Sequence, residues 1–189
     1  MLCVQDDNQI ANPKDLPYIF VCKFDDESVT AFYKSFLEML ADNKIKIIPV
    51  VVSSFGGQVH SLLSMLDIIE ASPKPVATIG LGKAMSCGSV LLAYGTKGYR
   101  YAAPNTDIMI HEVSSMTWGK NSDLKNDSKH TDELNKKLFE LLESKGNMKK
   151  GYLLKEMRKR VNVDWFLSAS QYKTLGLVDH VAVPTFLKK

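Results

Sequence analysis

The sequence predicts one α/β domain built of layered β-α-β units, with a long helix projecting from it. Short apolar runs rich in β-branched residues alternate with segments whose apolar residues recur at helical spacing, which is typical of helices packed on a sheet. A long charged stretch with its own helical periodicity follows these units. The 189 residues, 45% of them apolar, suffice for one good core and not for two. We therefore expect a single domain over residues 1–189, with a head at about 18–111 and 163–183 and a projecting part at about 112–162.

The first half of the chain is predicted to form three strand–helix units. The strands are expected at residues 18–22, 45–52 and 76–79, and the first two look buried because they show no clean alternation. The helices are expected at residues 28–40, from 59 to about 69, and at 86–94. Acidic residues precede the first helix, the Gly56-Gly57 turn precedes the second, and Gly95 stands where a cap of the third belongs.

The second half is predicted to add two strands, the long helix and a short closing unit. Residues 99–103 and 107–111 are β-rich runs separated by Pro104-Asn105, which fits either a hairpin or a strand-turn-strand. The long helix ends near Gly146, and its apolar face is formed by Leu134, Leu138, Leu141 and Leu142. Since the domain offers little to cover that face, we expect another subunit to bury it. Helices at residues 153–160 and 168–175 and a strand at 181–183 complete the chain.

Composition and charge exclude several classes of function. A net charge of +3, from 24 basic and 21 acidic residues, gives no basis for binding nucleic acid or an anionic membrane. No apolar run approaches the roughly 20 residues of a membrane-spanning helix, and residues 1–14 lack the features of a secretory signal. Cys3, Cys22 and Cys87 have no metal-ligand spacing and suit a reducing compartment. We expect a cytoplasmic protein without a metal site or a cofactor.

Two Gly-containing segments that join a strand to a helix are the first candidates for a functional site. They are Ser54-Phe55-Gly56-Gly57 and the run at residues 82–88, which contains Ser86. In an α/β sheet such turns lie at the carboxyl ends of the strands, where open N–H groups can stabilise an anion. A serine at a helix start gains from the helix dipole, but the same position is also typical of a serine that only caps its helix.

A reactive serine needs a general base and a group that orients the base. His111 follows the apolar run at residues 108–110, so a strand end would carry it, and it is the candidate base. The other histidines are His60, His130 and His180. Asp164 lies between Val163 and Trp165, an apolar setting in which a carboxylate needs a partner; capping of the following helix is the alternative.

Several motifs occur in this chain in one characteristic order. They are Ser54-Phe55-Gly56-Gly57, Met85-Ser86-Cys87-Gly88, Gly95-Thr96-Lys97-Gly98-Tyr99-Arg100, Pro104-Asn105-Thr106, Met109-Ile110-His111, the run at residues 163–169, and Gly176-Leu177-Val178-Asp179. Over residues 18–183 the chain resembles the ClpP family of self-compartmentalising serine peptidases. The resemblance implies the layered ClpP/crotonase-like fold with a protruding handle helix at about 124–146.

The resemblance also implies an activity and the residues that carry it. A serine endopeptidase of this type would use Ser86 as nucleophile, His111 as base and Asp164 as the acid that orients the histidine. The backbone N–H groups of Gly57 and Cys87 would form the oxyanion hole. Peptide is expected to bind as an added strand, contacting Gly56, Gly57, Glu112, Trp118 and Gly119.

The implied assembly is a heptameric ring, with two rings interlocked by the handle into a tetradecamer that degrades peptides or unfolded proteins. A Clp ATPase is the implied partner, but the segment before the first strand is short for the family, so we expect little dependence on an unfoldase. The chain also departs from the family at Phe55 (usually proline), at Glu112-Val113 (usually Gln-Pro) and at Val163 (often arginine). Subsite preference and the charged contact between rings are therefore not carried over.

Other interpretations of the sequence stay open. The divergence suits a phage or mobile-element paralogue, including a head-maturation protease. A crotonase-like acyl-CoA enzyme shares the fold, a serine–lysine peptidase would use Lys83 as base, and an inactive ring subunit would need no chemistry at all.

Overall fold

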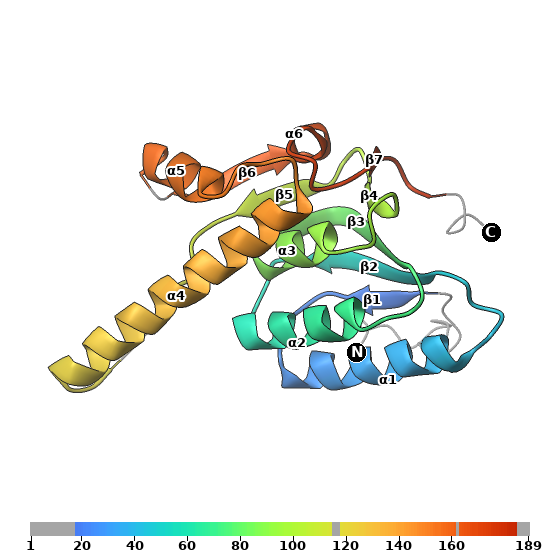
Figure 1. Cartoon of the computed structure of the whole chain (residues 1–189), viewed down its shortest axis with the longest axis horizontal. Coiled ribbons are helices and arrows are strands. Elements are labelled where there is room, and N and C mark those ends of the chain that lie inside the picture. Colours follow the sequence, from blue (N-terminus) through green and yellow to red (C-terminus); the bar gives the residue numbers. More distant parts are fainter. Residues whose placement is uncertain (1–17, 115–117, 162, 185–189) are drawn as a thin grey trace, which may run out of the picture.

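Strands β1 to β7 form one sheet in the computed structural model, which describes residues 18–114, 118–161 and 163–184 (Figure 1). The strands are β1 (Ile19–Val21), β2 (Ile48–Ser54), β3 (Val76–Met85), β4 (Arg100–Ala102), β5 (Asp107–Ile110), β6 (Trp165–Ser168) and β7 (His180–Val181). The helices are α1 (Asp26–Ala41), α2 (Val59–Glu70), α3 (Cys87–Ala93), α4 (Asn121–Lys145), α5 (Tyr152–Lys159) and α6 (Ala169–Thr174). The segment before residue 18, on which the expectation about ATPase docking depends, lies outside the described residues, as does Cys3.

The strand order is β1-β2-β3-β4-β7, and every pairing along this path is parallel. Helices α1, α2 and α3 supply the crossovers that parallel neighbours require. β5 lies parallel to the second half of β3, and β6 adds to β5 in the antiparallel direction. The predicted α/β fold of layered β-α-β units is thereby confirmed.

The main core lies between the sheet and helices α1, α2 and α3 (Figure 1). Val50 and Val52 of β2 belong to this core, whereas Val51 belongs to a smaller cluster with Ala77 and Ile79. Successive side chains of a strand point to opposite faces, so β2 is buried on both. This is why its sequence is a continuous apolar run rather than an alternating one.

Two features of the sheet differ from the sequence-based expectation, and a third decides between alternatives that the sequence left open. β3 continues through Gly80 and Gly82 to Met85, so most of the glycine-containing segment before Ser86 is strand rather than turn. The runs at 99–103 and 107–111 do not form a hairpin: β4 and β5 both lie parallel to β3, one after the other along it, so the strand-turn-strand alternative is right. The sequence pattern does not predict β6, because its four residues are too few to show a period.

Helix α4 divides into a projecting half and a packed half (Figure 1). Residues 121–130 are all exposed, while Leu138 and Leu142 are buried against the same chain, and Leu134 and Leu141 are half-buried. The expectation that another subunit must bury this apolar face is therefore wrong for Leu138 and Leu142, because the C-terminal half of α4 lies against α3. Among the described residues, no helix is both long and apolar enough to cross a membrane.

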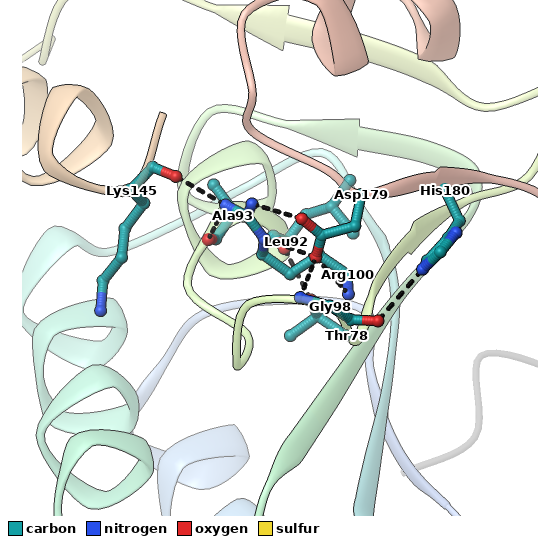
Figure 2. A network of polar contacts seen from close by, with 8 residues as sticks. All are labelled: Thr78, Leu92, Ala93, Gly98, Arg100, Lys145, Asp179 and His180. Carbon is teal, nitrogen blue, oxygen red and sulfur yellow. Dashed lines mark hydrogen bonds and ion pairs between the residues drawn. The ribbon is translucent and has the colours of Figure 1, made fainter. Parts of the chain in front are cut away.

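Arg100, which is buried, and Asp179, which is half-buried, come from two of the sequence motifs and form an ion pair at the C-terminal ends of α3 and α4 (Figure 2). The Nη2 of Arg100 lies 2.7 Å from Asp179 Oδ1, and Nη1 donates to the carbonyl oxygens of Lys145 at 2.7 Å and Ala93 at 3.4 Å. Burial alone would raise the pKa of the Asp179 carboxyl, but the hydrogen bonds from Arg100 and Gly98 outweigh it and the pKa lies below its ordinary value of 3.8. One side chain thus ties β4, β7, α3 and α4 together.

Candidate active site

Ser86 stands at the junction of β3 and α3 in a strained backbone conformation. Its φ of 54° and ψ of −122° lie in a region that residues other than glycine rarely adopt. Its N–H donates to Met109 O at 2.9 Å, which holds the junction against β5. The side chain makes no capping hydrogen bond to α3, although Ser86 occupies the N-cap position. The interpretation of Ser86 as a helix cap is therefore not supported, and its hydroxyl is free for another partner.

That partner is His111, which directly follows β5. The Nε2 of His111 lies 2.8 Å from Ser86 Oγ, within hydrogen-bond distance. The parallel register of β3 and β5 pairs Met85 with Met109, so both strands end at the same edge of the sheet and present the next side chains there. A serine and a histidine in this relation are the arrangement in which the imidazole can accept the hydroxyl proton.

Asp164 directly precedes β6, and the register of that strand places it opposite His111. Ile110 pairs with Trp165 in the antiparallel ladder, so the next pair outward is His111 with Asp164. Asp164 Oδ1 lies 3.6 Å from His111 Nδ1, an ion-pair distance that is longer than a hydrogen bond. The side chain is 52% exposed, so the predicted apolar setting is wrong, because Val163 beside it is exposed as well. Capping of a following helix is not its role, since Ser168 caps α6 with its own side chain.

The turn after β2 lies against Ser86 and leaves no room for side chains. A Cβ on Gly56 would lie 2.7 Å from Ser86 Cβ, and a Cβ on Gly57 would lie 2.4 Å from the carbonyl oxygen of Phe24. The N–H that bonds this turn to Phe24 O is that of Gln58, at 2.8 Å, and not that of Gly57. Cys87 is the first residue of α3, where backbone N–H groups lack partners within the helix. The predicted oxyanion donors, Gly57 and Cys87, thus both border the space at Ser86.

A cavity of about 280 Å³ opens beside these residues, and its lining includes Ser86, His111, Gly57 and Cys87. Its wall is largely apolar and comes from α2, α3, α4 and the segment after β5. These apolar residues include Val59, Val90, Val113, Leu138, Phe139 and Leu142. The sequence did not point to this wall, because Leu138 and Leu142 look like an ordinary helix face until α4 is placed against α3. The cavity can accept an apolar side chain next to the serine.

The remaining predicted contact residues do not line the cavity, and the structure describes only part of their segment. Glu112 is half-buried next to His111 but does not line the cavity, and neither do Trp118, which is 86% exposed, and Gly119. Residues 115–117, between His111 and the predicted contact residues Trp118 and Gly119, lie outside the described residues.

The competing bases are placed elsewhere. Lys83 Nζ lies over the ring of Phe55, 4.1 Å from its centroid, rather than on Ser86. His60 and His130 stack on each other, and His180 bonds the carbonyl of Gly98. Within the described ranges, no group of three or more His, Cys, Asp and Glu side chains could hold a metal ion. Of the groups considered, His111 is the base that the geometry offers to Ser86.

A comparison with protein families bears on the whole of this arrangement. The family model described as Clp protease matches residues 17–185, which span the sheet, the helices and every residue at the cavity discussed above. The parallel sheet with its crossover helices agrees with that assignment. The chain belongs to the Clp protease family.

Proposed function

We propose that this protein is a serine endopeptidase that cleaves peptide bonds with Ser86, His111 and Asp164. The observation that carries the proposal is the 2.8 Å contact between His111 Nε2 and the Oγ of Ser86, a serine held in a strained conformation at the edge of a cavity. Membership of the Clp protease family supports a peptidase over an acyl-CoA enzyme of the crotonase type. The position of Lys83 over Phe55 argues against a serine–lysine dyad.

The reaction follows from these positions. Ser86 Oγ attacks the carbonyl carbon of the scissile bond while its proton passes to His111 Nε2. The carbonyl oxygen becomes an oxyanion, which the N–H groups of Gly57 and Cys87 stabilise. His111 then gives the proton to the leaving amine, and a water molecule, deprotonated by the same imidazole, hydrolyses the acyl-enzyme. Asp164 holds the ring with its proton on Nδ1, so that Nε2 is free to accept one.

Substrate class follows from the cavity. The apolar wall formed by Val90, Leu138 and Leu142 suits an apolar side chain on the residue that precedes the cleaved bond. We further propose that the chain works as a ring of seven, stacked in pairs, because Clp proteases are generally oligomeric and residues 121–130 of α4 are exposed in the described part of the chain. The substrates of such an enclosed chamber would be peptides and unfolded proteins.

The test is labelling with a fluorophosphonate, which reacts only with an activated serine. We expect stoichiometric labelling of Ser86, located by mass spectrometry of the digested protein, and hydrolysis of a short peptide with an apolar residue before the cleaved bond. Ser86→Ala should remove the label and lower turnover by roughly 10³-fold or more. Ser170→Ala, which changes an exposed serine, is the control and should leave both unchanged. An unlabelled wild-type protein that has folded and assembled would identify an inactive ring subunit instead.

A further inference from the structure

The turn that carries one of the proposed oxyanion donors consists of two adjacent glycines. Gly56 has φ of +112° and Gly57 has φ of +150°, and neither can be replaced without a clash, as described above. Glycine is also the residue with the greatest backbone freedom. The N–H group of such a turn keeps a fixed direction only when contacts from outside the turn hold the peptide planes in place.

Hydrogen bonds hold the peptides on either side of the Gly57 N–H. On the first side, Gly56 N donates to Ser54 Oγ at 3.0 Å. On the second side, the peptide between Gly57 and Gln58 is held at both of its ends: Gln58 N donates to Phe24 O at 2.8 Å, and the thiol of Cys87 donates to Gly57 O at 3.3 Å. The last of these bonds is the one that links the turn to the residue after Ser86.

The thiol is suited to this contact. Cys87 is buried, with 2% of its surface exposed, and burial raises the pKa of the thiol above its ordinary value of 9.0, outweighing the lowering by hydrogen bonds with the Ser86 side chain and the backbone of Gly57 and Cys87. The thiol therefore keeps its proton at neutral pH and can donate. The backbone N–H of the same residue is the second proposed oxyanion donor. The family motif that this segment resembles has methionine here, whose thioether has no proton to donate.

We propose that Cys87 is a positioning residue for the oxyanion hole: its thiol bonds the carbonyl of Gly57 and so fixes the direction of the Gly57 N–H relative to the Cys87 N–H. The Cys87 side chain thereby links the two donor residues. Without this link, the direction of the Gly57 N–H would depend on a flexible pair of glycines. In this role Cys87 acts through Gly57. The inference rests on the proposed peptidase function.

The experiment compares Cys87→Ala, Cys87→Ser and the wild-type protein as full-length assemblies. We expect Cys87→Ala to lower kcat on the order of 10-fold, the loss typical of a modest misplacement of a catalytic group, with little change in KM. The affinity for a peptide aldehyde, whose adduct with serine places an oxygen in the hole, should fall by the same factor. Cys87→Ser keeps a donor of similar size and should restore most of both losses. Cys22→Ser, a change at the half-buried Cys22, is the matched control and should match the wild type.

Two results would overturn the inference without affecting the proposed function: an active wild-type enzyme with unchanged kcat and aldehyde affinity in Cys87→Ala, or a loss confined to KM. Should Cys87→Ala fail to assemble, infrared spectroscopy of the wild-type protein decides. The S–H stretching band of Cys87, assigned by its disappearance in Cys87→Ser, should lie at lower frequency than that of a free thiol, and a band at the free-thiol frequency contradicts the hydrogen bond. A wild-type protein without fluorophosphonate labelling would instead contradict the proposed function itself.

Discussion

Ser86 and Gly56 are packed against each other so closely that the conformation of one depends on the size of the other. A Cβ on Gly56 would meet Ser86 Cβ at 2.7 Å and Ser86 Oγ at 3.1 Å. Because Ser86 already adopts a strained φ, it has little freedom to move away. The glycine is therefore required by the position of the neighbouring serine as well as by its own φ of +112°.

We predict that Gly56→Ala lowers turnover by about 10²-fold, as expected for a nucleophile displaced by roughly 1 Å. The control is Gly151→Ala, which places a side chain at a similar positive φ of +81° with no atom within 4 Å of the new Cβ. Steady-state kinetics and thermal unfolding of both variants make the comparison. If backbone strain alone were responsible, both variants would lose stability and would have the same turnover. That result would contradict the prediction.

At the scale of the element, the two halves of α4 have different surroundings, and the sequence pattern does not show where one half ends and the other begins. Its packed half contributes Leu138, Phe139 and Leu142 to the cavity, while its projecting half is exposed. The packed half also carries Glu143, which is buried with 6% of its surface exposed. Its two carboxylate oxygens accept hydrogen bonds from Gly151 N and Leu153 N, each at 2.7 Å. These are N–H groups at the start of α5, whose N-cap residue, Gly151, has no side chain to cap it.

Glu143→Ala should destabilise the protein by about 2 kcal/mol, because it leaves a buried donor at the start of α5 without a partner. Glu143→Gln, which keeps one carbonyl oxygen, should cost about half as much. Chemical denaturation measures the loss, and hydrogen exchange should show faster exchange in α5 before the sheet is affected. Glu140→Gln, on the same helix as Glu143, removes an exposed pair with Lys150 of the segment between α4 and α5 and should leave stability nearly unchanged. Equal effects at both positions would contradict the capping role of Glu143.

At the scale of the whole molecule, the Arg100–Asp179 pair joins the end of the chain to the ends of α3 and α4 (Figure 2). Removing one partner of a buried pair is costly because the other charge remains buried. Since the folded-state pKa of Asp179 is lowered, the stability that this carboxylate contributes is fully present above its ordinary value of 3.8 and is lost as the pH falls through the lower folded-state value.

We predict that Asp179→Asn costs about 3 kcal/mol at neutral pH. The gap in unfolding free energy between this variant and the wild type should narrow once the pH falls below about 4, because the carboxyl of the unfolded wild-type chain then takes up a proton more readily than the carboxyl of the folded chain. Urea denaturation at a series of pH values provides the measurement. A gap that stays constant from neutral pH down to the acid limit of folding would show that the charge of Asp179 is not what stabilises the pair.

The proposed ring assembly is also tested on the whole molecule. Mass photometry of the purified protein should give a mass seven or fourteen times that of the 21.1 kDa chain. A mass of seven chains would agree with the absence of an arginine at Val163, and a stable monomer at micromolar concentration would contradict the assembly. Because Leu138 and Leu142 pack within their own chain, the proposed contact between subunits would use the exposed residues 121–130 of α4.

Local patterns in the sequence were enough to predict the α/β class, most of the helices, and the set of Ser86, His111 and Asp164 as candidates. Strand and helix periods, glycine turns and short motifs depend on residues close together in the chain, so they can be recognised from the sequence alone. Which candidates meet depends on contacts between distant segments. β6 has too few residues to show a period, yet its register on β5 is what places Asp164 opposite His111.

The same reason accounts for the other features that local patterns missed. Glu143 caps α5, although it belongs to α4. Arg100 pairs with Asp179, which lies 79 residues later in the chain, and the thiol of Cys87 donates to a carbonyl oxygen 30 residues earlier. Although Arg100, Asp179 and Cys87 belong to motifs of the sequence, those motifs do not show which partner each residue has, because a hydrogen bond or an ion pair depends on where the backbone folds back and not on the local period. Only the packing of α4 against α3 turned Leu138 and Leu142 from an apolar helix face into the wall of a cavity.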